Sequence, residues 1–286
     1  MASHTPIIPQ YIRKEGIPMK YETVTLKNGC QMDIFVPVAP TDFLTVPPEP
    51  FRPSIIICPG GGYAFRAVRE GEPLALRFAS LGFNTYVVHY RVAPNRFPDG
   101  LQDLACAVHW VRTHAKETYS HPDRIAVMGF SAGGHLAGSL GTMWNRPEIF
   151  APLGLTCEDV KPNGQVLCYP VISGGEFAHR GSFENLTGSA DLAVHEEYSL
   201  EKWAGPHTPP TFLWHTFNDA CVPVENAFLL GMALRKAQVE TEMHIWPDGP
   251  HGMSMADMSV YYQQQDCNQD IARWPEMAAN FLRRVM

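Results

Sequence analysis

The fold is decided by residues 124–143, which read RIAVMGFSAGGHLAGSLGTM. The short apolar run at 124–128 predicts a buried strand, and the run at 132–143 predicts a helix rich in small residues. Between them, Gly129-Phe130-Ser131-Ala132-Gly133 leaves room only for a tight turn. Strands that alternate with helices are the building plan of parallel α/β sheets. This stretch therefore predicts an α/β protein.

Strands and helices alternate on both sides of this stretch. The expected strands are 20–27, 31–36, 54–58, 84–89, 165–169, 211–216 and 242–246, and the expected helices are 74–81, 101–116, 225–238 and 275–285. Asn28-Gly29, between the first two strands, is a strong hairpin signal. The pattern predicts a mostly parallel, doubly wound sheet with an antiparallel N-terminal hairpin.

The length of 286 residues fits one large domain, and we expect a single domain over residues 1–286. The polar, glycine-containing stretch 173–210 is too long for an ordinary loop. We expect it to form a small cap-like insertion or an interface element.

The composition excludes several classes of protein. Lysine and arginine number 22 against 29 aspartates and glutamates, which gives a net charge of −7 and lacks the basic excess of a nucleic-acid-binding domain. No apolar run is long enough to span a membrane. The seven cysteines are widely spaced without a Cys-x-x-Cys pair, so neither a disulfide framework nor a thiolate metal site is indicated. The N-terminus, MASHTP, shows no secretory pattern, so we expect a cytoplasmic protein unless an export signal has been trimmed away.

Ser131 is the candidate nucleophile. It lies at the centre of a Gly-x-Ser-x-Gly motif between a predicted strand and a predicted helix, which is the context of a nucleophile elbow. Its hydroxyl would stand at a helix N-terminus, where the helix dipole favours developing negative charge. The plain alternative is a glycine-rich turn that carries a solvated serine.

A glycine run is the second candidate feature. The predicted strand 54–58 leads into Pro59-Gly60-Gly61-Gly62-Tyr63, whose backbone N–H groups have no side chains in the way. Such donors, together with the N–H of Ala132 after the nucleophile, can stabilise an oxyanion. A phosphate-binding loop is the alternative, but no Gly-Lys-Ser/Thr follows.

Asp219 and His251 are the candidate acid and base. Asp219 follows the predicted strand 211–216, and His251 follows the predicted strand 242–246. Both therefore fall at the carboxyl ends of strands, where parallel α/β sheets place their sites, and in the chain order Ser, acid, His. Asp248 is the alternative acid, but its position three residues from His251 favours a turn role. His89, His215 and His244 lie within predicted strands, which favours packed or hydrogen-bonded histidines.

The ordered set of motifs resembles the bacterial acetyl-xylan-esterase-like serine esterases of the α/β-hydrolase superfamily. The motifs are the glycine run, the serine elbow, Cys168-Tyr169-Pro170-Val171-Ile172-Ser173, Pro209-Pro210-Thr211-Phe212-Leu213-Trp214-His215-Thr216 and Gly249-Pro250-His251-Gly252. The resemblance implies an α/β-hydrolase fold, a triad of Ser131, Asp219 and His251, and oxyanion donors at Gly61, Gly62 and Ala132. One departure is Pro59, where His-Gly-Gly-Gly esterases carry histidine.

The function expected from these features is a serine carboxylic-ester hydrolase. We expect it to remove small acyl groups, acetyl above all, from xylan or xylo-oligosaccharides, without a metal or another cofactor. The partner would be a small-molecule or oligosaccharide ester, with homo-oligomers allowed. Tyr63 is a candidate substrate contact, and Trp203 is a second aromatic near the expected mouth. The alternatives are an amidase or exopeptidase with the same triad and a non-catalytic binding protein on a hydrolase fold.

Overall fold

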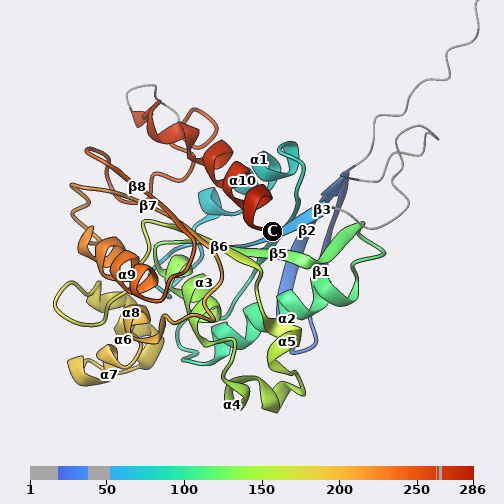
Figure 1. The fold of residues 1–286 in the computed structure, drawn as a ribbon, viewed down its shortest axis with the longest axis horizontal. Helices are drawn as coiled ribbons and strands as arrows, with labels where there is room; N and C mark the ends of the chain where they lie inside the picture. Colours follow the sequence, from blue (N-terminus) through green and yellow to red (C-terminus); the bar gives the residue numbers. More distant parts are fainter. Residues whose placement is uncertain (1–18, 38–51, 262, 264–265) are drawn as a thin grey trace, which may run out of the picture.

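A single eight-stranded sheet runs through the described residues (Figure 1). The computed structural model describes residues 19–37, 52–261, 263 and 266–286. The strand order in the sheet is β1-β2-β4-β3-β5-β6-β7-β8. The strands are β1 Met19–Thr25, β2 Gln31–Pro37, β3 Arg52–Cys58, β4 Asn84–Val88, β5 Ser120–Phe130, β6 Gly164–Cys168, β7 Thr211–Thr216 and β8 Thr241–Trp246.

The sheet is antiparallel at one edge and parallel elsewhere. Strand β2 pairs antiparallel with both β1 and β4. The pairs from β4 through β3, β5, β6 and β7 to β8 are all parallel. The hairpin turns through Gly29, whose φ of 86° suits glycine. The predicted α/β fold, with its antiparallel N-terminal hairpin and mostly parallel sheet, is confirmed.

Helices cover both faces of the sheet (Figure 1). The α-helices are α1 Glu72–Ser80, α2 Asp99–Thr113, α3 Ala132–Met143, α4 Pro147–Phe150, α5 Cys157–Val160, α6 Arg180–Thr187, α7 Leu192–Glu196, α8 Leu200–Trp203, α9 Glu225–Lys236 and α10 Trp274–Val285; the 3₁₀ turns are η1 Val68–Glu70, η2 Ala151–Leu153 and η4 Ile271–Arg273. Helices α2, α3 and α9 contribute to one hydrophobic core, and α1 and α10 contribute to the other. The sheet is therefore buried on both sides, as parallel sheets are.

The carboxyl ends of β3 and β5 meet without intervening side chains. A Cβ atom added to Gly133, in the first turn of α3, would lie 2.1 Å from the carbonyl oxygen of Cys58 at the end of β3. Only glycine permits that approach. The N-terminus of α3 is consequently pressed against the start of the glycine loop, which we define as residues 59–63.

The stretch 173–210 contains α6, α7 and α8, which gather beside α9 (Figure 1). It is tied to the glycine loop because Asn185 Nδ2 donates to the carbonyl of Gly62 at 2.9 Å. It is tied to α3 because His135 Nε2 lies 2.9 Å from the carbonyl oxygen of Tyr198. Both contacts hold this segment next to the carboxyl ends of the central strands.

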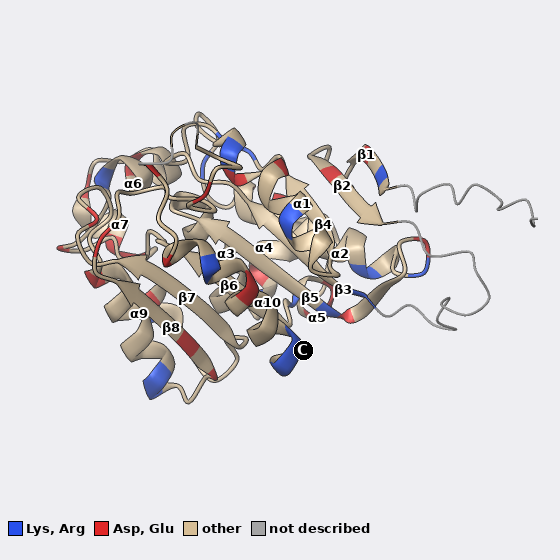
Figure 2. Cartoon of the chain, turned by 90° about the horizontal axis from the view of Figure 1, so that it is seen from above, with Lys and Arg blue, Asp and Glu red and all other residues tan. Residues whose placement is uncertain are grey.

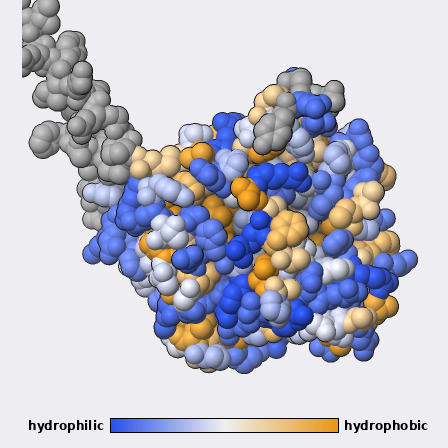
Figure 3. Space-filling model, turned by 180° about the vertical axis from the view of Figure 1, so that it is seen from behind, coloured by the Kyte–Doolittle hydropathy of each residue, from blue (hydrophilic) through white to orange (hydrophobic). Residues whose placement is uncertain are grey.

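The surface is mixed in charge and hydropathy. Acidic and basic residues are interspersed over the drawn chain (Figure 2), and apolar residues lie in small groups among polar ones on the face in Figure 3. None of the helices in the described part of the chain combines the length and apolar character needed to cross a bilayer.

Candidate active site

Ser131 occupies a strained position between β5 and α3. Its backbone has φ 54° and ψ −120°, a conformation that non-glycine residues adopt only where the surrounding structure enforces it. The close packing leaves no space for a side chain at position 129, because a Cβ atom on Gly129 would lie 2.0 Å from the Gly133 carbonyl oxygen. This strand–turn–helix geometry is that of a nucleophile elbow.

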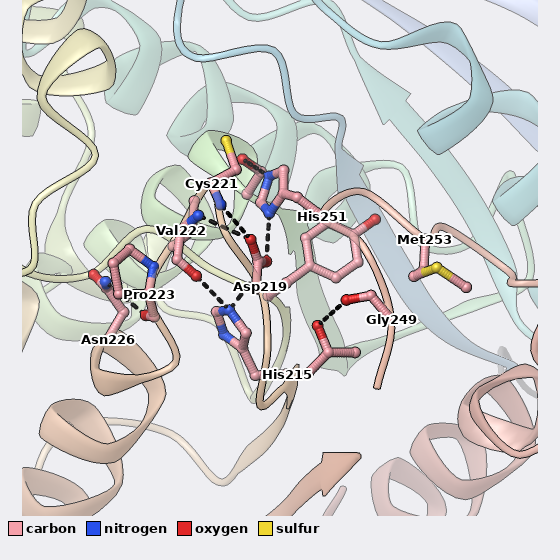
Figure 4. Close-up of polar contacts among 12 residues, drawn as sticks. His215, Asp219, Cys221, Val222, Pro223, Asn226, Gly249, His251 and Met253 are labelled. Atoms are coloured by element: carbon pink, nitrogen blue, oxygen red, sulfur yellow. Dashed lines mark hydrogen bonds and ion pairs between the residues drawn. The ribbon is translucent and has the colours of Figure 1, made fainter. Parts of the chain in front are cut away.

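The side chains of Ser131, His251 and Asp219 form a hydrogen-bonded chain. His251 Nε2 lies 2.8 Å from Ser131 Oγ, and His251 Nδ1 lies 2.7 Å from Asp219 Oδ2 (Figure 4). Asp219 follows β7 and His251 follows β8, so parallel neighbouring strands deliver both groups to one edge of the sheet. Of the sequence candidates, these three come together. Asp248 instead accepts a hydrogen bond from Asn218, as a turn residue does.

Asp219 is held as a carboxylate by several donors. Its Oδ1 accepts hydrogen bonds from the N–H groups of Cys221 at 2.8 Å and Val222 at 3.0 Å. Burial alone would disfavour the charged form, but the hydrogen bonds from His215, His251 and Val222 outweigh it and hold the pKa of Asp219 well below its usual value. Asp219 is therefore held in its ionised form, as the acid of a Ser-His-Asp arrangement must be.

His215 is a further contact of Asp219 that sequence reasoning did not assign to the site. The sequence indicated only a packed or hydrogen-bonded histidine within a strand. Its buried Nε2 lies 2.9 Å from the Val222 carbonyl oxygen and 3.3 Å from Asp219 Oδ2 (Figure 4). Both neighbours are acceptors, so Nε2 carries a proton shared between them. The sequence signal was a histidine four residues before the acid.

The backbone groups of the glycine loop differ in whether they have hydrogen-bond partners among the described residues. The carbonyl oxygen of Gly60 accepts from Ala67 N, that of Gly61 from Ala64 N, and that of Gly62 from Asn185. By contrast, no acceptor within the described residues is paired with the N–H of Gly61, Gly62 or Ala132. Unpaired donors beside a serine nucleophile are what an oxyanion hole requires.

The structure places the Tyr63 ring in the interior, so it gives no support for a substrate contact there. The side chain is 4% exposed, and its hydroxyl lies 2.9 Å from His135 Nδ1 in the interior. The ring also packs edge-on against Tyr90. Trp203 is partly buried in α8, donates to the Glu197 carbonyl and lies under the guanidinium of Arg146. Both aromatic side chains therefore stabilise the fold.

Residues 55–255 match the family described as alpha/beta hydrolase fold. The chain belongs to this family. Two curated relatives of this chain are endo-1,4-beta-xylanase B of Butyrivibrio fibrisolvens, 34% identical over 72% of this chain and 33% of that protein, and an acetylxylan esterase of Xylanibacter ruminicola, 31% identical over 80% of this chain and 46% of that protein. The chain thus spans less than half the length of either curated relative.

Solved structures give a closer match in length. An acetyl ester-xyloside bifunctional hydrolase from Caldicellulosiruptor lactoaceticus is 37% identical, with a TM-score of 0.75 over 90% of this chain and 88% of that one. The carboxylesterase Cest-2923 from Lactobacillus plantarum is 28% identical, with a TM-score of 0.81 over 93% and 97%. The resemblance to acetyl-xylan-esterase-like hydrolases expected from the motifs is confirmed.

Proposed function

We propose that this protein is a serine carboxylic-ester hydrolase that removes small acyl groups, above all acetyl, from xylan-derived sugars. The observation that carries the proposal is the chain from Ser131 Oγ through His251 to Asp219, with distances of 2.8 and 2.7 Å. Nucleophile, base and orienting acid in this arrangement are the parts needed for acyl transfer.

The mechanism follows from the hydrogen bonds. His251 Nε2 takes the proton of Ser131 as its oxygen attacks the ester carbonyl. The oxyanion that forms is stabilised by the N–H groups of Gly61, Gly62 and Ala132. Collapse of the tetrahedral intermediate transfers the proton from His251 to the leaving alcohol and leaves an acyl group on Ser131. Water, deprotonated by His251, then releases the carboxylic acid and restores the serine.

The surroundings of the glycine loop favour a polar leaving group. His179 Nδ1 lies 2.8 Å from Ser182 Oγ, and Ser182 Oγ would lie 3.8 Å from a Cβ atom at Gly62. Ser182 is buried, so the partly exposed imidazole of His179 is the polar group offered here by residues 173–210, which we propose act as a cap over a sugar alcohol. The names acetylxylan esterase and acetyl ester-xyloside hydrolase among the similar proteins support the same substrate class.

Acetate release from acetylated xylo-oligosaccharides, compared between wild type and Ser131→Ala, tests the proposal. We expect rapid release by the wild type and a loss of at least about 1,000-fold in the variant. Ser139→Ala, a serine two turns further along α3, serves as the matched control and should keep activity. Cleavage of p-nitrophenyl acetate alone, dependent on Ser131, would retain the esterase and reject the xylan substrate. Cleavage of neither ester would favour an amidase or a binding protein.

A further inference from the structure

Glu70 is a buried carboxylate that the acyl-transfer mechanism does not use. It ends the 3₁₀ turn η1 and is 3% exposed. Among the described residues, no lysine, arginine or histidine forms an ion pair with it. Burying an unpaired acid is unfavourable unless its oxygens accept hydrogen bonds. A residue needed only to fill space would not carry this cost.

One carboxylate oxygen of Glu70 holds the glycine loop. Oε2 accepts a hydrogen bond from the N–H of Gly60 at 2.8 Å. Gly60 is also pressed against the nucleophile, since a Cβ atom there would lie 3.1 Å from Ser131 Cβ. The next two residues, Gly61 and Gly62, carry the unpaired N–H groups. The position of Gly60 therefore sets where those donors lie relative to Ser131.

The other oxygen of Glu70 holds the residue that packs on the base. Oε1 accepts a hydrogen bond from the hydroxyl of Tyr169 at 2.7 Å. The Tyr169 ring meets the His251 ring edge-on, with centroids 5.2 Å apart and an interplanar angle of 73°. Its hydroxyl also accepts from the N–H of Ser254, at 2.9 Å, in the loop that carries His251. Tyr169 is thereby fixed at its tip and faces the imidazole.

The turn that carries Glu70 also contacts the His251 loop directly. Ser254 Oγ donates to the carbonyl of Arg69 at 2.7 Å. Gly252 follows His251, and a Cβ atom there would lie 2.6 Å from Arg69 Nη2, so the loop passes directly over the turn. The segments around residues 60 and 169 therefore meet at the Glu70 carboxylate, and the segment around residue 254 contacts the Tyr169 hydroxyl and the Arg69 carbonyl beside it.

We propose that Glu70 is a positioning residue that holds the glycine loop and, through Tyr169, the imidazole of His251 in register with Ser131. This inference rests on the proposed esterase function. Glu70 contacts neither substrate nor nucleophile. It acts by fixing, with one rigid side chain, both the oxyanion donors and the general base. Burial raises the pKa of Glu70, and the hydrogen bonds from Tyr169 and Gly60 oppose that rise.

Glu70→Gln is the principal test. Glutamine keeps the volume but has a single acceptor oxygen, so either the Gly60 N–H or the Tyr169 hydroxyl loses its partner. We expect kcat for p-nitrophenyl acetate to fall about 10- to 100-fold, below the loss for removing an oxyanion donor outright, with KM changed less than about threefold. Tyr169→Phe should give a smaller fall of the same kind and remains informative if the glutamine variant does not fold.

Two matched controls separate positioning from stability. Asp103→Asn removes another fully buried carboxylate, which binds Arg91, and Tyr86→Phe removes another buried hydroxyl, which contacts Ser120. Both should lower the unfolding midpoint while kcat stays near wild type. Affinity for a boronic acid that adds to Ser131 should fall with kcat in Glu70→Gln but not in the controls.

Comparing Glu70→Gln with Ser131→Ala separates failure of the positioning role from failure of the proposed esterase function. A Glu70→Gln enzyme that is less stable but has wild-type kcat and boronate affinity would overturn the positioning role, provided that Ser131→Ala is inactive. Full activity of Ser131→Ala would instead overturn the esterase proposal itself. The double variant Glu70→Ala/Tyr169→Phe should lose less than the sum of the two single losses, because each change removes the hydrogen bond between Glu70 and Tyr169. Additive losses would contradict the route through Tyr169.

Discussion

His215 restricts rotation of the Asp219 carboxylate by contacting its Oδ2 atom. Asp219 Oδ1 is held by two backbone N–H groups of its own turn, so Oδ2 must serve both His251 and His215. The other ring nitrogen of His215, Nδ1, is buried and has no hydrogen-bond partner among the described residues. His215 therefore directs its one paired ring nitrogen, Nε2, toward Asp219 Oδ2 and the Val222 carbonyl oxygen, which limits how far the carboxylate can turn.

Replacement of His215 tests this role. His215→Phe removes the donor while keeping a flat ring, and we expect kcat/KM for p-nitrophenyl acetate to fall about 10-fold, the lower end for a hydrogen bond to a charged group. His215→Gln supplies a new N–H donor and should recover part of the loss. His244→Phe, a partly exposed histidine on the neighbouring strand β8, is the control and should leave kcat/KM unchanged. Wild-type kinetics in His215→Phe would contradict the role.

The sequence alone indicated which side chains lie together where each candidate follows a strong local pattern. Ser131, Asp219 and His251 stand out because each follows a strand with a distinct apolar pattern, and parallel pairing brings those strand ends together. Glu70 and His215 could not be found in this way. Glu70 contacts Gly60 and Tyr169 across 10 and 99 residues of sequence, and a buried acid at the end of a 3₁₀ turn has no pattern of its own. The inward direction of the Tyr63 ring could not be predicted either, because proximity in sequence to the glycine loop says nothing about which way a ring points.

The longer helices and the strands could be predicted from the sequence, and the shortest helices could not. Strand β7 and helix α3 have the predicted bounds, 211–216 and 132–143, since each has a clear apolar or small-residue pattern. Helices α4 and α5, of four residues each, were missed because one turn is too short to show a 3.6-residue period. A capping box that joins Thr156 and Asp159 was the available signal for α5. Strand β5 begins at Ser120, four residues before the predicted start.

Helix α3 is joined to the segment 173–210 by a histidine that must stay neutral. His135 donates from Nε2 to the Tyr198 carbonyl and accepts at Nδ1 from the Tyr63 hydroxyl. Burial lowers the pKa of His135 from 6.5 to about 4, although the bond to Tyr198 opposes the shift. In the unfolded chain the ring takes up a proton as the pH falls through about 6.5. The folded chain resists protonation until about pH 4.

This difference makes stability depend on pH with a definite sign. Between about pH 6.5 and 4 the unfolded chain binds a proton at His135 that the folded chain does not bind. The contribution of His135 to the stability of the fold is therefore complete above pH 6.5 and is lost as the pH falls. Lowering the pH from 7.5 to 5 should decrease the free energy of unfolding by about 2 kcal/mol through this residue. Urea unfolding followed by tryptophan fluorescence measures the loss. His135→Gln, which does not titrate, should show a correspondingly weaker pH dependence. An unchanged dependence would contradict the assignment, and His244→Gln serves as the control.

Cysteine side chains lie in both hydrophobic cores of the molecule. All seven thiols are free, and Cys30, Cys58, Cys106 and Cys168 are buried, the first three in one core and the last in the other. Burial raises the pKa of Cys30 to about 12 and that of Cys106 to about 11, and only thiolates react readily with alkylating and disulfide reagents. Cys221 is exposed, and Cys157 and Cys267 are partly exposed. We therefore expect the exposed and partly exposed thiols to react in the native protein, and the buried thiols to react only after unfolding.

We expect methyl methanethiosulfonate to modify at most Cys221, Cys157 and Cys267 in the native protein, with all four buried thiols reacting only in denaturant. If the two cores open together, the buried thiols should react at one common rate across a urea series, because both lie against the same sheet. Mass spectrometry of tryptic peptides gives the rate at each site. Esterase activity should survive native modification, since Asp219 uses the backbone N–H of Cys221 and not its thiol; Cys221→Ala is the control. Earlier reaction of Cys168 alone would show instead that the face covered by α1 and α10 opens independently of the other.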